Sequence, residues 1–144
     1  MPLPSPEPGL VLSYSYLWKR QQKRGSEEGE KERPCVIILS IENSAGETVV
    51  TVVPVTSRPP TDNRTALAIP PKIKQHLGLD TAPSWVVVNE VNRFIWPGPD
   101  LRQIPDQPGR FDYGFVPPRL YTAIKAALLD LHRGRRLRGV DRTP

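Results

Sequence analysis

Two apolar runs rich in β-branched residues, joined by a short polar segment, constrain the fold of this chain most. Residues 34–41 read PCVIILSI, residues 48–55 read TVVTVVPV, and ENSAGE stands between them. Valine, isoleucine and threonine favour strands, whereas asparagine, serine and glycine favour turns. The pattern predicts an antiparallel hairpin whose first strand is buried on both faces.

Other periodic segments predict the remaining elements. The segments 9–18 (GLVLSYSYLW), 65–69 and 84–95 have the composition and patterning of strands. Residues 70–79 begin with two prolines and carry Gly78 near their end, which predicts a short helix. Residues 19–33 are mostly charged and lack an apolar stripe, so we expect a mobile loop there. Residues 117–135 predict the main helix, because apolar residues recur at three- and four-residue spacing: Leu120, Ile124, Ala127, Leu128 and Leu131.

The expected fold class is mostly β with an α component. Five strands with short connections and a C-terminal helix predict a small, strongly bent antiparallel sheet or partly open barrel, with the helix packed on it. At 144 residues the chain suits one domain, which we place at residues 8–131. Residues 1–7 form a short proline-rich segment, and residues 132–144 are expected to be a basic, flexible tail.

Charge and cysteine content limit the class of protein. The net charge is +5, and most of it belongs to the end of the chain, so the body of the domain is nearly neutral. A single cysteine excludes an internal disulfide and favours a reducing compartment. No apolar run approaches the length needed to span a bilayer. We therefore expect a soluble, cytoplasmic protein without a membrane partner.

An Arg-Pro pair and a Thr-Ser pair are the first candidates for chemistry. Proline holds Arg33 in an extended conformation at the start of the strand 34–41. Thr56 and Ser57 follow the end of the strand 48–55. Because antiparallel pairing places the start of one strand beside the end of the other, Arg33 and Thr56 should meet and form a cradle for a phosphate. Taken alone, each pair is explained as well by a surface arginine and a turn cap.

A second candidate cluster lies in the polar half of the strand 84–95. Glu90 and Asn92 share one face of the strand, and Arg93 points to the other. Glu90 could be a general base, a partner of Arg33 or part of a solvated ion pair. Trp96 follows in a WPGP turn and could stack a base or cap the turn.

Several common catalytic signatures are missing. The sequence contains no HExxH, CxxC, GxxxxGK[ST] or GxSxG motif, and its two histidines make a paired-histidine hydrolase improbable. Cys35 is expected to be a buried apolar side chain rather than a reactive thiol. We expect no metal site and no cofactor.

Taken in order, four pieces of the sequence resemble one protein family. The segment RGSEEGEKERPCVIIL, then VVPVTS, then VVNEVNRF and a C-terminal helix resemble the MazF/PemK (Kid-like) toxins of type II toxin-antitoxin systems over roughly residues 8–131. The resemblance implies an SH3-like barrel of the CcdB/MazF type, with about five to seven antiparallel strands, that forms a homodimer. It implies a metal-independent, sequence-specific endoribonuclease that cleaves single-stranded RNA through attack of the ribose 2′-OH. Its partner would be an antitoxin whose disordered acidic segment covers the RNA groove.

The resemblance also assigns roles to residues. Arg33 would stabilise the phosphorane charge, Thr56 with Ser57 would bind or polarise the scissile phosphate, and Glu90 is the candidate for the second acid or base. Where many members carry a glutamine followed by Arg-Thr or Lys-Ser, this chain has Glu90-Val91-Asn92-Arg93. Either Glu90 serves, or Arg33 and Thr56 suffice, or the activity is weak. The expected RNA-binding residues are Arg24, Ser26, Glu27, Lys31, Ser57, Arg58, Asn92, Arg93 and Trp96.

Two other functions remain open at this point. The acidic loop and the unusual Glu90 segment would suit a MazF-like module that only binds RNA or a partner protein. A topoisomerase poison of the CcdB type shares the fold but relies on a tryptophan near the chain end, where this chain reads GVDRTP. Cleavage of RNA, and its loss on Arg33→Ala, would separate the ribonuclease from the module that only binds.

Overall fold

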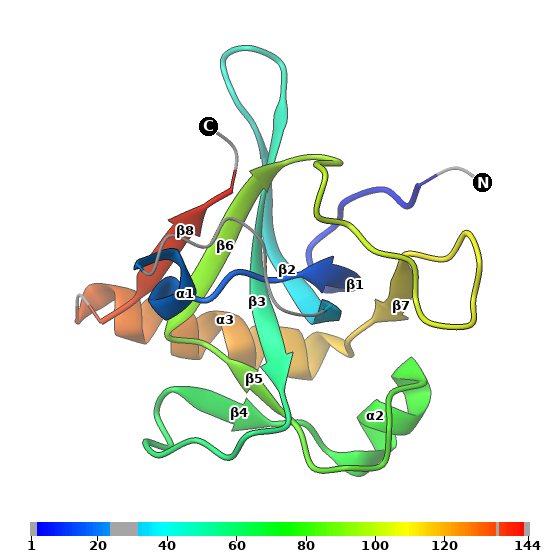
Figure 1. Cartoon of the computed structure of the whole chain (residues 1–144). Helices are drawn as coiled ribbons and strands as arrows, with labels where there is room; N and C mark the ends of the chain where they lie inside the picture. Colours follow the sequence, from blue (N-terminus) through cyan, green and yellow to red (C-terminus); the bar gives the residue numbers. More distant parts are fainter. Residues whose placement is uncertain (1–2, 24–31, 135, 143–144) are drawn as a thin grey trace.

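The computed structural model describes residues 3–23, 32–134 and 136–142. These residues form eight strands and three helices (Figure 1). In chain order the elements are β1 (Leu10–Ser15), α1 (Lys19–Lys23), β2 (Glu32–Glu42), β3 (Thr48–Thr56), β4 (Ala66–Ala68), α2 (Pro71–Leu77), β5 (Trp85–Val87), β6 (Glu90–Ile95), β7 (Asp112–Phe115), α3 (Pro118–Arg133) and β8 (Arg138–Asp141).

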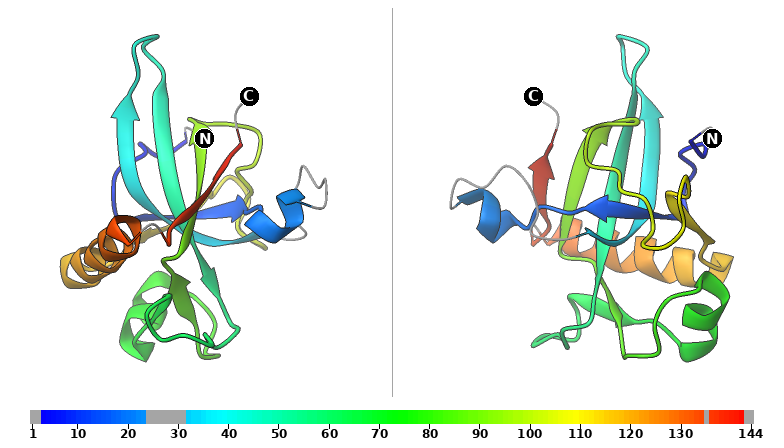
Figure 2. Two further views of the ribbon diagram at one scale, coloured as in Figure 1. Left: turned by 90° about the vertical axis from the view of Figure 1, so that its left-hand side faces the viewer. Right: turned by 45° about the vertical axis from the view of Figure 1, so that its right-hand side comes forward.

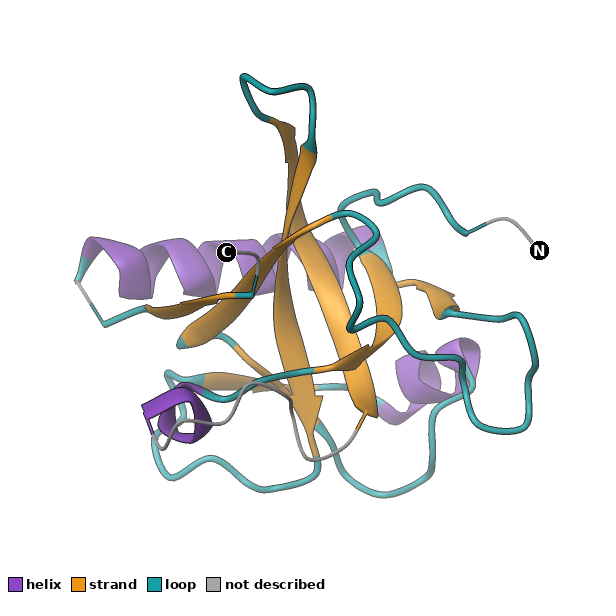
Figure 3. Ribbon diagram, turned by 45° about the horizontal axis from the view of Figure 1, so that its top comes forward, coloured by secondary structure: helices purple, strands orange, loops and turns teal. Residues whose placement is uncertain are grey.

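A strongly bent sheet forms the body of the fold, with β3 near its middle. The strand order is β4-β5-β3-β2-β1-β7, and β6 pairs with both β3 and β8. All named pairings are antiparallel except that of β6 with β8, which is parallel. Helix α3 lies across one side of the sheet (Figure 3). The predicted mostly-β fold with a C-terminal helix is confirmed.

The hairpin of β2 and β3 is the longest pairing in the sheet, as the two β-branched runs predict. Its register runs from Cys35 opposite Pro54 to Glu42 opposite Thr48. In the turn, the side-chain oxygen of Asn43 accepts hydrogen bonds from the backbone N–H groups of Ala45 and Glu47, at 3.0 and 2.9 Å. The tip of the hairpin projects well beyond the rest of the sheet (Figure 2).

The two faces of the sheet bury two separate apolar clusters. One lies between the sheet and α3, which contributes Leu120, Ile124, Leu128 and Leu131, four of the five apolar positions predicted from the spacing. The other is aromatic: the rings of Tyr14 and Phe94 stack with centroids 4.8 Å apart. This second cluster supports the end of β1, which leads into the candidate site.

Three local expectations differ from the structure. The segment 84–95 is not one strand, because β5 pairs with β4 and the end of β3, whereas β6 pairs with the start of β3 and with β8. The first part of the expected loop 19–33 is helix α1, and residues 24–31 lie outside the described residues. Residues 101–116, for which the sequence predicts no strand, contribute β7. With β7, β8 and the division into β5 and β6, the described residues form more strands than the five expected from the sequence.

The basic tail expected at residues 132–144 is largely structured. Helix α3 continues to Arg133, and Arg138–Asp141 forms β8 beside β6. Val140 is fully buried, and the Arg142 side chain forms an ion pair with Asp100. The buried Val140 and the ion pair of Arg142 hold this segment against the sheet, although its charge alone predicts a solvated tail.

Candidate functional site

Arg33 and Thr56 meet at one edge of the sheet, where β2 begins and β3 ends. Pairing of Cys35 with Pro54 continues toward this edge, and Arg33 Nη1 donates a hydrogen bond to the carbonyl oxygen of Val55 at 3.3 Å. The side chains of Arg33, Thr56 and Ser57 line the same pocket. The predicted convergence of the Arg-Pro and Thr-Ser pairs is therefore seen in the structure.

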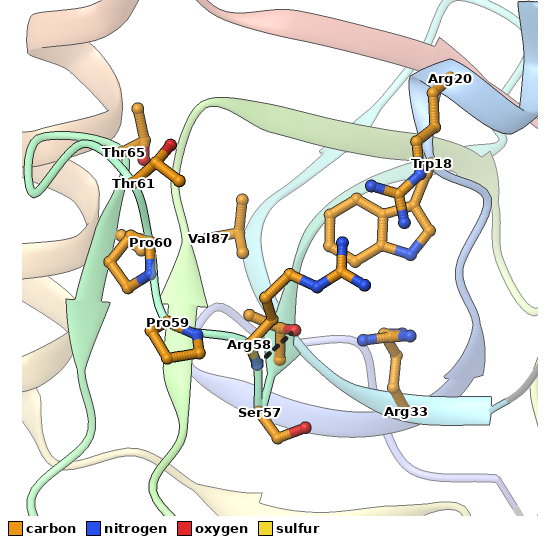
Figure 4. Close-up of a pocket in the computed structure, with 12 residues that line it drawn as sticks. Trp18, Arg20, Arg33, Ser57, Arg58, Pro59, Pro60, Thr61, Thr65 and Val87 are labelled. Atoms are coloured by element: carbon orange, nitrogen blue, oxygen red, sulfur yellow. Dashed lines mark hydrogen bonds between the residues drawn. The ribbon is translucent and has the colours of Figure 1, made fainter.

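This first pocket has a volume of about 410 Å³ and a strongly cationic lining (Figure 4). Arg20, Arg33 and Arg58 all line it, together with the hydroxyls of the Thr56-Ser57 pair, and its described lining includes no carboxylate. Thr56 Oγ1 also accepts a hydrogen bond from the Arg58 N–H at 3.2 Å, so it caps the turn as well as facing the pocket. Guanidinium and hydroxyl groups in this arrangement suit a phosphate.

Trp18 is a site residue that the sequence reasoning missed. Its ring centroid lies 5.0 Å from Arg33 Cζ and 5.5 Å from Arg20 Cζ, within the range of cation–π contacts. The predicted strand 9–18 carries the signal that could have found Trp18. Its antiparallel pairing with β2 places Tyr14 opposite Arg33, so the chain that leaves β1 passes this edge of the sheet. Arg20, in α1, reaches the pocket for the same reason.

A second pocket, of about 400 Å³, adjoins the first and shares Arg33, Thr56 and Ser57 with it. Its other walls come from residues 78–84 after α2 and from residues 104–113 before and within β7. Two carboxylates, Glu32 and Asp80, lie in its lining. The shared residues thus form a ridge between a cationic hollow and one of mixed charge.

Glu90 lies outside both pockets. Its Oε1 atom accepts hydrogen bonds from the Tyr16 hydroxyl at 3.2 Å and from the Lys19 N–H at 3.1 Å. Burial raises the pKa of the Glu90 carboxyl above its ordinary value, although these two hydrogen bonds act against the shift. The Tyr16 and Trp18 rings meet edge to face with centroids 5.1 Å apart, so these aromatic side chains link Glu90 to the pocket.

Three other expected site residues are not brought to the pockets. Asn92 is fully buried, and its amide bonds both the N–H and the carbonyl of Leu17, which makes it a backbone clamp rather than an exposed RNA contact. Arg93 is exposed but packs over Gly139 of β8. Trp96 packs against Phe94, with ring centroids 6.2 Å apart. Arg24, Ser26, Glu27 and Lys31 lie outside the described residues.

The described residues contain neither an exposed cysteine nor a cluster of metal ligands. Cys35 is completely buried, and burial raises the pKa of its thiol far above the ordinary value. Among residues 3–23, 32–134 and 136–142, no group of three or more His, Cys, Asp or Glu side chains is placed to hold a metal ion. No helix in these ranges is long and apolar enough to cross a membrane.

Comparison with known proteins identifies the family of the chain. A model of the PemK-like, MazF-like toxins of type II toxin-antitoxin systems matches residues 16–94, more than half of the chain. The match begins just before Trp18 and includes Arg33, Thr56, Ser57 and Arg58. No curated protein and no solved structure gives a significant match. The chain belongs to the PemK-like, MazF-like toxin family of type II toxin-antitoxin systems.

Proposed function

We propose that this protein is the toxin of a type II toxin-antitoxin system and acts as an endoribonuclease on single-stranded RNA. The observation that carries the proposal is the ridge of Arg33, Thr56 and Ser57 between two adjoining pockets, in a chain of the PemK/MazF family. A phosphodiester on this ridge would have its two flanking nucleosides directed to the two sides. Pockets of about 400 Å³ each are within the size range of small-ligand sites.

The proposed reaction needs only groups that stabilise charge. The ribose 2′-oxygen loses its proton to water and attacks the adjacent phosphorus, the bond to the 5′-oxygen breaks, and this oxygen takes a proton from water. The products carry a 2′,3′-cyclic phosphate and a 5′-OH. Arg33 would stabilise the extra negative charge of the phosphorane, with Thr56 and Ser57 donating to its oxygens. Dependence on the 2′-OH gives selection of RNA over DNA.

Among the roles considered for the second acid or base, the geometry favours reaction without Glu90. The Glu90 carboxylate is occupied by Tyr16 and Lys19 and faces neither pocket. We assign to it the support of Tyr16 and α1, while Arg33 and Thr56 act on the phosphate. The cationic lining by Arg20, Arg33 and Arg58 also suits an acidic antitoxin segment that competes with RNA for the same pocket.

Family membership supplies the remaining expectations. We propose that the toxin forms a homodimer, that it acts on messenger RNA in the cytoplasm, and that cleavage inhibits growth until the antitoxin binds. A specific observation also favours a second function. The described lining of the first pocket contains no carboxylate that could act as a general base. A protein that binds RNA without cutting it needs no such base and would use the same arginines.

Purified protein free of antitoxin tests both functions in one experiment. A long mixed-sequence RNA is incubated in EDTA with the wild type, Arg33→Ala and Thr56→Ala, and with the exposed α3 substitutions Arg119→Ala and Thr122→Ala as matched controls. Discrete fragments with 5′-OH ends, lost only in the two site variants, would support the ribonuclease. Intact RNA with folded wild type would contradict it, and RNA binding that depends on Arg33 would then support the binding module.

A further inference from the structure

We propose that the C-terminal segment Arg138–Arg142 is a clamp that positions Trp18, and through Trp18 the guanidinium of Arg33, at the pocket. The segment lies outside the residues that match the family model, which end at residue 94. Its predicted effect on cleavage rests on the proposed function, whereas its predicted effect on Trp18 does not. Arg142, Asn92 and Trp18 would be positioning residues, since none of them acts on the phosphate itself.

Arg142 is the centre of the clamp. Its side chain is 4% exposed, and Nη2 lies 2.8 Å from Oδ1 of Asp100, which is 10% exposed. Nη1 donates to the carbonyl oxygen of Ser15 at 2.8 Å and to Oδ1 of Asn92 at 3.2 Å. A buried ion pair persists only where further hydrogen bonds compensate its desolvation, and here these bonds reach the last residue of β1.

Asn92, which accepts from Arg142, connects the clamp to Leu17, the residue before Trp18. Its Oδ1 accepts from the Leu17 N–H at 3.0 Å, and its Nδ2 donates to the Leu17 carbonyl oxygen at 2.8 Å. Lys19 is held from the same side, because its Nζ donates to the carbonyl oxygen of Gly139 in β8 at 3.2 Å. The Leu17 backbone on one side of Trp18 is therefore tied to β6, and the Lys19 side chain on the other side is tied to β8.

Trp18 connects the clamp to the pocket, because it lines the pocket and contacts Arg33. Its ring centroid lies 5.0 Å from Arg33 Cζ, and the ring also makes an edge-to-face contact with Tyr16. A cation–π contact of this kind holds a guanidinium over a ring and limits the positions it can take. If the backbone at Leu17 and Lys19 loosened, the ring and the guanidinium would lose their common position.

The clamp also has an anchor of its own. Val140, in the middle of β8, is fully buried, and the Arg142 N–H donates to the Arg93 carbonyl oxygen at 2.8 Å. The parallel pairing of β8 with β6 runs from Glu90 opposite Arg138 to Arg93 opposite Asp141. The segment that grips the β1 end is thus fixed to the sheet independently of the site.

Fluorine NMR of protein labelled with 5-fluorotryptophan tests the clamp without any need for activity. The chain contains three tryptophans, and Trp18→Phe identifies the Trp18 signal. In Arg142→Gln we expect the Trp18 signal to shift and broaden while that of Trp85, in β5, which pairs with β3 and β4 rather than with β8, stays in place. Arg133→Gln removes the same charge from an exposed position and should leave all three signals unchanged.

A milder variant guards against loss of folding. Lys19→Met removes the contact with Gly139 but leaves the ion pair of Arg142 with Asp100, and we expect a smaller shift of the same signal. If the wild type cleaves RNA, both variants should lower kcat, by about tenfold in Arg142→Gln, with a smaller change in KM, because a misplaced Arg33 affects the transition state most. A moved Trp18 signal with a wild type that does not cleave would support the clamp and contradict the ribonuclease. An unmoved signal, or equal shifts at Trp18 and Trp85, would overturn the clamp.

Discussion

Lys74 is a buried cation whose removal should destabilise the wall of the second pocket. Its side chain is 5% exposed, and its Nζ donates to Oδ1 of Asp80 and to Oγ of Ser84, both at 2.7 Å, and to the carbonyl oxygen of Ala82. These three acceptors lie in the loop that follows α2, and Asp80 and Ser84 line the second pocket. Lys74→Met keeps the length of the buried stem and removes all three hydrogen bonds.

The magnitude depends on which acceptors can turn to water instead. Asp80 is 76% exposed, so its carboxylate stays solvated and the ion pair itself contributes about 1 kcal/mol at most. Ser84 is buried, and loss of its bond to a charged donor costs about 1.5–3 kcal/mol. With partial hydration of Ala82, which is exposed, we expect a total loss of about 2–3 kcal/mol.

Urea unfolding of Lys74→Met and of Lys72→Met checks this value. Lys72 is an exposed residue of the same helix, so its substitution controls for the loss of charge and for helix propensity. A loss of about 2–3 kcal/mol corresponds to a fall in Tm of roughly 7–10 °C for a domain of this size. Equal stability of the two variants would refute the assignment of Lys74 as the residue that holds the loop.

The same variant makes a prediction about pH. The hydrogen bond from Lys74 lowers the pKa of the Asp80 carboxyl below its ordinary value. A depressed pKa in the folded state contributes stability above the ordinary pKa of the group, and this contribution is lost as pH falls through the folded value. Lys74→Met should therefore lose less stability than the wild type on acidification, and a parallel decline of the two proteins would contradict this.

Three further predictions concern other parts of the molecule. Burial raises the pKa of the Glu90 carboxyl. The contribution of this shift to stability is complete below the ordinary pKa of the group and is lost as pH rises through the pKa of the folded state. In urea unfolding, Glu90→Gln should therefore gain stability relative to the wild type as pH increases. Arg58→Gln should reduce the slope of log affinity for single-stranded RNA against log salt by about 0.7, and a slope like that of Arg119→Gln would argue against a phosphate contact. Ile124→Ala should cost about 3 kcal/mol in urea unfolding because Ile124 is fully buried between α3 and the sheet, and a loss below about 1 kcal/mol would contradict that packing.

The parts of the fold that were predictable from the sequence depend on local regularity. The β2–β3 hairpin has β-branched runs on both sides of a turn segment, and α3 has apolar residues at helical spacing. Antiparallel pairing then placed Arg33 beside Thr56 without further information. The division of residues 84–95 into β5 and β6 was not predictable in this way, because it depends on which part of β3 each strand meets.

Alternation along a strand gives the face of each side chain but not the elements that cover that face. The pattern correctly separated Glu90 and Asn92 from Arg93, yet nothing local showed that Leu17 would cover Asn92. The covering segment comes from a contact across 75 positions of sequence, and such contacts leave no periodic signal. The sequence therefore predicts an RNA contact at Asn92, whose side chain the fold buries.

The same limitation applies to the arginine-rich end of the chain, for which the sequence predicts a flexible tail. Charge density describes the average side chain of a segment, whereas its fate here depends on Val140, which is buried, and on Arg142, which finds Asp100 and the Ser15 carbonyl in the interior. Arg138, the first residue of β8, stays exposed. Arginines with the same local signal thus have opposite environments, and only the tertiary structure separates the buried Arg142 from the exposed Arg138.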